Sequence, residues 1–540
     1  MADANKVKKV VLALSVIALV SVLLLDNDIR GSDLVSVPVM SSKAFFKMQE
    51  SGQEVEEDYG FDLLYNGTKL PYDITLSTYY LPQFLGSDWE EGTITATDGV
   101  DIFFEESLTN LDKEQIMAEN TPVDFYALKG NSYRTYSLVV TGLPAMTIDD
   151  SNAVMEDGTV LFEMALYDPS ETTDWVTKSY TTAAYRGNSS MEYPKKSFRL
   201  KLKEETKNGY KGCKENLLNL RKDDDWILNG LYADDSRMRD KLSLDLWEEL
   251  GAYDNPYNLE FGTKMEYVEL FVNDNYQGLY GLTYPVDVKQ AGISAGNTGS
   301  GFQEYLYKKK YTAFWNATDF TGALADENMP DYRGGFQLKG ANTEFSYEKF
   351  EPLRQLAVLM TLDDTDFAKN AESTIDIDNA LNNWLFYQAI AGFDNVGKNY
   401  YYVAKIAGNR YHGYFIPWDL NISWGDVVTQ NNEFYAETDT TTAENIVEWD
   451  PGQRLVDENV SNSVSLVKSK WTFWRNNELA DEELEKRIDV LSSEINDSGA
   501  VLREQAKWPE GNCTGDAAVI KDYGKKRMEA VDEYINGLTE

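Results

Sequence analysis

The first 28 residues constrain the chain most, because they contain an apolar run with charges of opposite sign at its two ends. Three lysines stand before the run Val10–Leu25, and two aspartates follow it. As a helix these 16 residues would span roughly 24 Å, slightly less than the ~30 Å hydrocarbon core of a bilayer. Since positive charge stays on the cytoplasmic side, we expect the rest of the chain outside the cytoplasm.

This segment predicts a membrane-anchored protein at the cell surface. We expect residues 1–28 to form a cytoplasmic tip and an uncleaved signal anchor, and residues 29–45 to form a linker. The sequence before Asp26 offers no convincing small-x-small cleavage site, which favours the anchor. A cleaved signal peptide, which would release a secreted protein, and a buried helix are the alternatives.

The length and the patterns of the remaining chain indicate more than one folded unit. With 540 residues, two or three units are expected, and a hydrophobic content of 42% is enough for packed cores. Short strand-like stretches between Gly, Asp and Asn turns predict a β-rich subdomain over residues 46–142. Strands and helices then mix over residues 143–540, with a helical region from about residue 470, so an α+β fold is expected.

Charge and rare residue types exclude several classes of function. The formal charge of −40 repels phosphate backbones, so nucleic acid is not an expected partner and a basic protein fits better. His412 is the only histidine, which excludes metal sites built from several histidines and leaves the chemistry to carboxylates with Lys or Arg. Cys213 and Cys513 either form one long-range disulfide or remain two buried thiols.

One stretch places two acids and an amide in an order that suits phosphoryl transfer. A helix predicted over residues 379–391 ends just before Asp394, and Asn399 follows five positions later. A predicted hairpin over residues 400–417 then carries Asp419 at its end. In protein kinases the acid of such a loop orients the substrate hydroxyl, while the amide and the second acid bind Mg²⁺. Because Asp and Asn are common in loops, ordinary capped turns are the alternative for this spacing.

A lysine and two arginines are the candidates for binding phosphate. Lys196 shares the strand parity of Phe198 and Leu200, so we expect it to point inward, where a nucleotide phosphate would satisfy its charge. Arg186 and Asn188 lie in a short Gly-containing loop that either offers backbone N–H groups to phosphates or is a plain turn. Arg239, on a predicted helix, either orients phosphate or pairs with a carboxylate.

Seven segments stand in a characteristic order and spacing within about residues 143–426, and they are Arg186–Leu202, Asp225–Gly230, Met238–Leu242, Glu269–Asn273, Gln277–Tyr280, Gly334–Phe336 and Phe415–Asp419. In this order and spacing they resemble domains of the spore-coat-protein-H (CotH) family of atypical protein kinases. The resemblance implies a divergent protein-kinase-like fold in a secreted or surface protein. Its best-studied members phosphorylate serines of spore-coat proteins with ATP and a divalent metal.

The resemblance implies specific roles for the loop residues. Asp394 would take the catalytic position, and Asp419, Asn399 and Asn421 would hold Mg²⁺ or Mn²⁺. Relatives often have Asp-x-Asp where this chain has Asn421, which implies weaker metal binding because one anionic ligand is lost. Relatives also often have Glu where this chain has Tyr284.

The sequence therefore favours an atypical kinase that transfers the γ-phosphoryl group of ATP to Ser or Thr of a surface or coat protein. An inactive pseudokinase scaffold and an adhesin are the main alternatives. A glycoside hydrolase with Asp394 and Asp419 as its carboxylate pair is a third, but it gives Asn399 no role.

Overall fold

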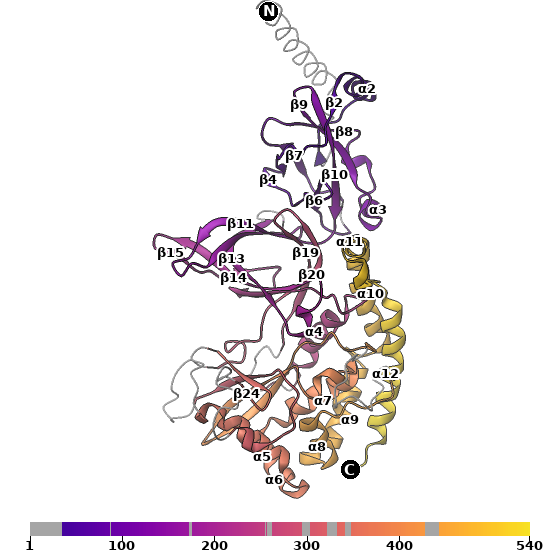
Figure 1. Ribbon diagram of the computed structural model, residues 1–540. Helices are drawn as coiled ribbons and strands as arrows, with labels where there is room; N and C mark the ends of the chain where they lie inside the picture. Colours follow the sequence, from indigo (N-terminus) through magenta and orange to yellow (C-terminus); the bar gives the residue numbers. More distant parts are fainter. Residues whose placement is uncertain are drawn as a thin grey trace, which may run out of the picture. The chain divides into compact units, whose positions relative to one another are not determined.

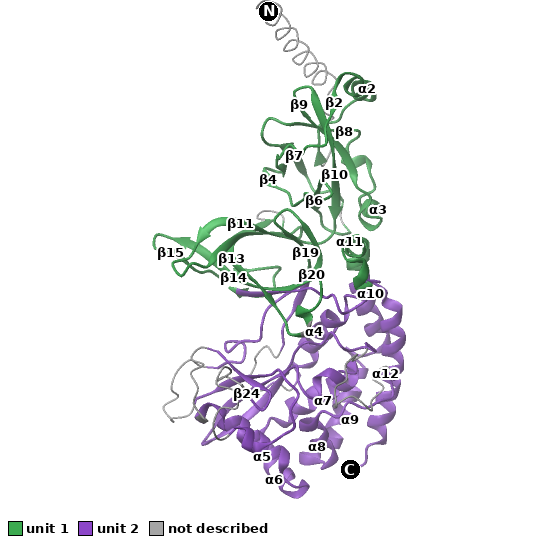
Figure 2. Cartoon of the chain, viewed as in Figure 1, with its two compact units in different colours: residues 1–224, 267–280, 493–512 green, residues 225–266, 281–492, 513–540 purple. Residues whose placement is uncertain are grey.

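A computed structural model of the chain describes residues 35–540, apart from residues 87 and 254 and the segments 172–174, 256–261, 294–302, 321–331, 341–346 and 427–441. The chain forms two compact units, which are described separately (Figure 2). Unit 1 comprises Met1–Asp224, Tyr267–Tyr280 and Ser493–Asn512, and unit 2 comprises Asp225–Glu266, Gly281–Ser492 and Cys513–Glu540. Each unit therefore combines segments that are far apart in the sequence.

The N-terminal part of unit 1 is β-rich, as its sequence predicted. Its elements are β1 Val35–Ser36, α2 Ser42–Ser51, β2 Gln53–Glu54, β3 Leu63–Tyr65, β4 Thr68–Lys69, β5 Tyr72–Asp73, β6 Thr78–Pro82, β7 Gly92–Ala96, β8 Asp101–Phe104, α3 Lys113–Ala118, β9 Val123–Lys129 and β10 Ser132–Thr141. One sheet has the strand order β1-β7-β3-β4, and another has the order β5-β6-β10-β9-β8 with β2 beside β10. Buried aromatic side chains, including Tyr79, Phe125 and Tyr136, form much of the core.

The N-terminal end of the described chain differs from the expected linker. Within residues 35–45, Val35–Ser36 form β1 and α2 begins at Ser42, and the side chains of Val35 and Met40 are buried. The apolar side chains of this short polar segment thus attach it to the fold. The predicted anchor Val10–Leu25 lies outside the described residues. Among the residues that the structure describes, no helix combines the length and apolar character that a bilayer crossing requires.

The second part of unit 1 is a curved set of strands. Its elements are β11 Ala145–Val154, β12 Val160–Tyr167, β13 Val176–Arg186, β14 Ser197–Thr206, β15 Gly209–Gly212, β16 Glu215–Asn216, β17 Lys222–Asp223, β19 Met265–Val272, β20 Tyr276–Thr283 and the helix α11 Ala500–Lys507. In an eight-stranded sheet, β13, β12, β11, β19 and β20 are neighbours in that order, β14 pairs with both β13 and β15, and β16 and β17 form a separate two-stranded sheet. The ladder between β11 and β19 is parallel, and the hairpins from β11 to β15 are antiparallel.

Unit 2 combines an antiparallel sheet with most of the helices (Figure 1). Its elements are β18 Asp225–Asn229, α4 Arg239–Leu250, β21 Tyr305–Lys309, β22 Tyr332–Arg333, β23 Phe336–Lys339, α5 Glu351–Thr361, α6 Asp364–Thr374, α7 Ile377–Ile390, β24 Tyr400–Ala407, β25 Arg410–Pro417, α8 Asp450–Asp457, α9 Ser463–Arg475, α10 Asp481–Asp497 and α12 Ala517–Gly537. The sheet has the order β22-β23-β21-β24-β25. The last turn of α10 belongs to unit 1. The expected mixed α and β composition and the helical C-terminal region are confirmed.

Helix α7 is the centre of unit 2. All of its residues from Asn379 to Ile390 are buried, and it contacts α4, α8, α9, α12 and β25. The carboxylate of Asp376 caps its N-terminus by accepting the Asn379 N–H at 2.9 Å. Ala391, with a left-handed φ of 54°, ends it. The chain therefore leaves α7 inside the unit and enters the loop before β24 already surrounded by protein.

Candidate active site

The loop between α7 and β24 carries the first predicted acid. A short 3-10 turn, Phe393–Asn395, follows α7 and presents Asp394, whose exposed fraction is only 4%. One carboxylate oxygen, Oδ2, accepts a hydrogen bond from Asn399 Nδ2 at 2.5 Å. The other, Oδ1, lies 3.0 Å from the ammonium of Lys398. The spacing of five residues that the sequence shows is thus a direct contact between Asp394 and Asn399.

The electrostatic surroundings of Asp394 combine burial with two compensating donors. Burial raises the pKa of Asp394 above its ordinary value, and the ammonium of Lys398 opposes this shift. The negative charge of Asp419 also raises the pKa of Asp394, so the two acids are near enough to interact. A carboxylate in this position favours a cationic or proton-donating neighbour. That property suits both a hydroxyl substrate and a metal ion close by.

Asp419 follows β25 and is held by its backbone neighbours. Its side chain is exposed, and its φ of 61° lies in the left-handed region, which is rare for a residue other than Gly. On its N-terminal side, the Trp418 N–H donates to Asn399 O at 3.0 Å. The side chain of Asn395 donates from Nδ2 to both Asn399 O at 2.8 Å and Trp418 O at 3.0 Å. Asn395 therefore joins the loop of Asp394 to the end of β25.

Asp394, Asn399, Asp419 and Asn421 form a group of oxygen donors, here named the loop cluster, that suits a hard divalent cation. Because the amide nitrogen of Asn399 donates to Asp394, the carbonyl oxygen of that side chain is left as the donor for a cation. Asp419 supplies an exposed carboxylate, and Asn421, which is half-buried, follows two residues later. Among the described residues no three His, Cys, Asp or Glu side chains are grouped as a metal site. A site here would thus depend on amide oxygens and two carboxylates, which fits Mg²⁺ or Mn²⁺ but not a site rich in nitrogen or sulfur.

Strand β21 supports the loop from the other side. The backbone carbonyl of Lys309 accepts the Asn399 N–H at 2.9 Å. The side chain of Lys309 is only 2% exposed, and burial lowers its pKa to about 7. Its ammonium donates to Gly334 O at 2.8 Å and lies 4.5 Å from the centre of the Phe336 ring. Neither Lys309 nor Asn395 was among the residues that the sequence singled out.

The prediction that Lys196 points inward is wrong, and Lys195 is the buried lysine. Lys196 is half-buried and donates to Met191 O at 2.6 Å, whereas Lys195 is 2% exposed. In unit 1 the ammonium of Lys195 lies 2.6 Å from Glu504 Oε1, and both side chains are fully covered. Strand β14 begins only at Ser197, so the alternation of a strand does not extend back to either lysine. No local signal in the sequence links Lys195 to a glutamate 309 positions away.

The other predicted phosphate ligands are placed as follows. Arg239 is 3% exposed, and its guanidinium lies 2.6 Å from carboxylates of both Asp234 and Asp235. Burial opposes its charge, but these acids outweigh burial and raise the pKa of Arg239. The structure therefore shows the carboxylate pairing that was the alternative, and the assignment of Arg239 to a nucleotide is corrected. Arg186 ends β13, and the exposed Asn188 belongs to the tight turn after it, where its carbonyl accepts the Met191 N–H at 3.1 Å.

The two cysteines and Tyr284 are also placed. Cys213 and Cys513 are free and buried, in agreement with the alternative of two thiols. Tyr284 is fully buried in unit 2, with its ring 6.2 Å from that of Trp226 in an edge-to-face arrangement. Tyr284 is thus a core residue of unit 2 in this chain.

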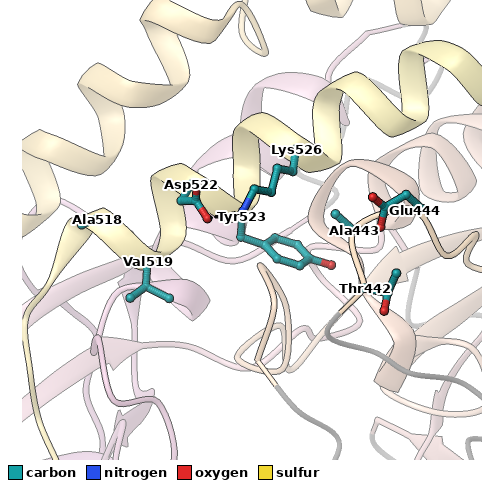
Figure 3. A pocket seen from close by; sticks show the side chains of 8 residues that line it. All are labelled: Thr442, Ala443, Glu444, Ala518, Val519, Asp522, Tyr523 and Lys526. Atoms are coloured by element: carbon teal, nitrogen blue, oxygen red, sulfur yellow. Dashed lines mark hydrogen bonds and ion pairs between the residues drawn. The ribbon is translucent and has the colours of Figure 1, made fainter.

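A separate cavity in unit 2 does not contain the predicted residues. It has a volume of about 590 Å³ and lies between residues 442–444 and α12, where Tyr523 and Val519 line it (Figure 3). None of Asp394, Asn399 or Asp419 lines this cavity. The cavity is therefore distinct from the cluster formed by Asp394, Asn399 and Asp419.

Comparison with protein families gives a match to the region that contains this loop. A family model described as CotH kinase protein matches residues 183–531, which is well over half of the chain. The matched region begins near the end of β13 and extends into α12, so it includes the loop of Asp394 and the end of β25. A search of curated proteins gives no match to this sequence.

Proposed function

The chain belongs to the CotH kinase protein family, and on this premise we propose that it transfers the γ-phosphoryl group of ATP to Ser or Thr hydroxyls of a protein. The observation that supports the proposal best is the contact of Asp394 with Asn399, beside a second acid, Asp419. Phosphoryl transfer requires an oriented nucleophile and oxygen ligands for a metal, and this cluster offers both.

In this proposal each residue of the cluster has one role. Asp394 accepts a hydrogen bond from the substrate hydroxyl and orients its oxygen toward the phosphorus atom. The ammonium of Lys398 favours the ionised form of Asp394, and Asn399 fixes the direction of the carboxylate. Asp419, Asn399 and Asn421 would hold Mg²⁺ or Mn²⁺. When bound, such an ion neutralises charge on the phosphates of ATP.

Lys195 is not proposed to bind phosphate, because its side chain is fully covered and its ammonium is paired with Glu504 within unit 1.

The substrate and the location belong to the same proposal. The net charge of −40 favours a basic protein as substrate, since opposite charge accelerates encounter. Residues 1–28 are proposed to anchor the protein in a membrane, with the folded units outside the cytoplasm at the cell surface. A surface or coat protein with accessible Ser or Thr is thus the proposed target.

An inactive pseudokinase is the second candidate, because one feature favours it. Asn421 stands two residues after Asp419, where relatives often have a second acid. With one anionic ligand fewer, the cluster would bind a divalent ion more weakly. Measured turnover distinguishes this candidate from the first.

The proposal is tested by phosphotransfer from labelled ATP with Mg²⁺ or Mn²⁺, using the full chain and a basic Ser/Thr protein, read by mass spectrometry. We expect Asp419→Ala to abolish transfer and to weaken binding of metal and ATP together. Asp394→Ala should leave binding nearly intact and reduce turnover by ~10²-fold or more. Asp366→Ala, at an exposed acid on α6, is the control and should behave as wild type.

Two outcomes would contradict the assignment. If Asp394→Ala and Asp419→Ala both retain wild-type transfer, the catalytic centre lies elsewhere. If both variants unfold, the two acids are structural. Binding of ATP without any turnover in the wild type would favour the pseudokinase, and no binding at all would favour the adhesin or the glycoside hydrolase.

A further inference from the structure

The backbone around Asp419 is fixed on both sides, and the second side depends on a residue far away in the sequence. Toward the N-terminus, Trp418 is bound by Asn399 and Asn395. Toward the C-terminus, the Leu420 N–H donates to Asp240 Oδ1 at 3.1 Å. Since a left-handed φ is costly for Asp, these contacts on both sides explain why Asp419 retains it.

Asp240 is well placed for this contact because it lies in the first turn of α4. Its side chain is 4% exposed, and its second oxygen, Oδ2, accepts from Asn229 Nδ2 at 2.8 Å. Asn229 is in turn oriented, since its own Oδ1 accepts the Leu231 N–H at 3.2 Å. The carboxylate of Asp240 is therefore held in one direction, with one oxygen pointing to the residue after Asp419.

The rest of the segment after Asp419 is attached to the same helix. The indole N–H of Trp424 donates to Ser243 Oγ at 2.9 Å, one turn further along α4. Ser423 Oγ lies 3.3 Å from Ser243 Oγ and donates to Leu420 O at 2.6 Å. Helix α4 is thus a platform for residues 419–424, and Asp240 is its contact nearest to Asp419.

We propose that Asp240 is a positioning residue for the metal-binding carboxylate of Asp419, acting through the Leu420 N–H. This inference rests on the proposed function only for the role of Asp419 as a metal ligand. A hydrogen bond to a charged acceptor contributes enough to change local opening of the turn by about 10- to 100-fold. Without Asp240, the turn samples other conformations, and the metal site is assembled for a smaller fraction of the time.

The test exchanges the two partners in the pair Asn229 and Asp240. In Asp240→Asn, the new amide has one oxygen for two donors, the Leu420 N–H and Asn229 Nδ2, so one hydrogen bond is lost. In Asn229→Asp, two carboxylates face each other without a donor between them, so the hydrogen bond between residues 229 and 240 is lost. The double variant Asn229→Asp with Asp240→Asn restores the bond with the donor and acceptor exchanged, and its new amide oxygen again accepts the Leu420 N–H. Asp245→Asn, which removes an acid from the same helix, is the matched control.

Two measurements are made on the full chain. Hydrogen exchange read on peptides that contain residues 418–426 reports opening of the turn, and titration with Mn²⁺ in the presence of a non-hydrolysable ATP analogue reports metal binding. In Asp240→Asn we expect exchange at Leu420 to be at least about tenfold faster and the Kd for Mn²⁺ to rise by a similar factor. The double variant should return both values to within about threefold of wild type, and Asp245→Asn should change neither.

The outcomes separate this inference from the proposed function. Wild-type exchange and Mn²⁺ binding in Asp240→Asn would overturn the positioning role. If Asp240→Asn unfolds, the double variant decides: recovery of both readouts supports the role, and failure to fold makes Asp240 part of the core and the role wrong. If the wild type binds no Mn²⁺, Asp419 is not a metal ligand, and the claim that Asp240 positions a metal-binding carboxylate is wrong. The exchange measurement then still shows whether Asp240 fixes the turn.

Discussion

Replacing Lys309 by methionine tests how a buried ammonium affects the stability of unit 2 and the strand that supports the active-site loop. The pKa of Lys309 is lowered from 10.5 to about 7, with burial as the main cause and Asp319 opposing it. No carboxylate among the described residues forms an ion pair with it, and its hydrogen-bond acceptors are the carbonyls of Gly334 and Ala313. The folded protein therefore releases this proton at a lower pH than the unfolded chain does.

The sign and size of the effect follow from this difference. Between pH 7 and 10.5 the unfolded chain holds a proton that the folded protein has lost, so raising the pH in this range favours folding. Stability therefore falls as the pH falls from 10.5 to 7, and below pH 7 the full cost of burying the charge remains and no longer changes with pH. From pH 7 to pH 9 the gain is about 2 kcal/mol, because the slope is about half of ~1.4 kcal/mol per pH unit at the folded midpoint and approaches the full value toward pH 9.

The assay is urea unfolding at pH 6, 7, 8 and 9, followed by tryptophan fluorescence. Lys309→Met does not titrate, so the wild type should gain about 2 kcal/mol more than the variant between pH 7 and 9. In addition, the loss of the donor to two carbonyls should lower the free energy of unfolding of the variant by roughly 1–3 kcal/mol at every pH. Lys525→Met, at an exposed lysine of α12, is the control and should follow the wild type. Parallel curves for the wild type and Lys309→Met would refute the reasoning.

Three further predictions follow from the two lysines, the N-terminus and the cysteines. Lys195→Met should destabilise the protein by about 3 kcal/mol or more, since it leaves its glutamate partner buried and unpaired. Lys196→Met should change the melting temperature little. Calorimetry of both variants checks this prediction, and equal effects of the two substitutions would contradict it. If Val10–Leu25 is an anchor, protease added to intact cells should digest the folded units while the mature N-terminus still contains Met1; an N-terminus near residue 27 would indicate cleavage instead. Cys213 and Cys513 should both react with iodoacetamide in denaturant without a reductant, and mass spectrometry that shows protection until reduction would reveal a disulfide.

The sequence by itself determined the order of elements around the candidate active site. The apolar periodicity of residues 379–391 and the alternation over residues 400–417 are local signals, and the structure places α7 and the β24–β25 hairpin within two residues of them. The positions of Asp394, Asn399 and Asp419 at the ends of these elements follow directly from the chain order. These features depend on hydrogen bonds and side-chain patterns between near neighbours, which a sequence displays.

Only the tertiary structure decided which charged side chains are buried and with what partners. The alternation of side chains along the strand predicted that Lys196 is the buried lysine, but the regular strand begins only after it. Lys195 is buried instead, because it pairs with a glutamate from a helix near the C-terminus. In the same way Asp240 reaches the Leu420 N–H across 180 positions of sequence. A buried charge is stable only where a partner meets it, and such partners come from distant segments that packing brings together. The chemistry of the loop is therefore local in origin, whereas its exact orientation is set by contacts that no local pattern contains.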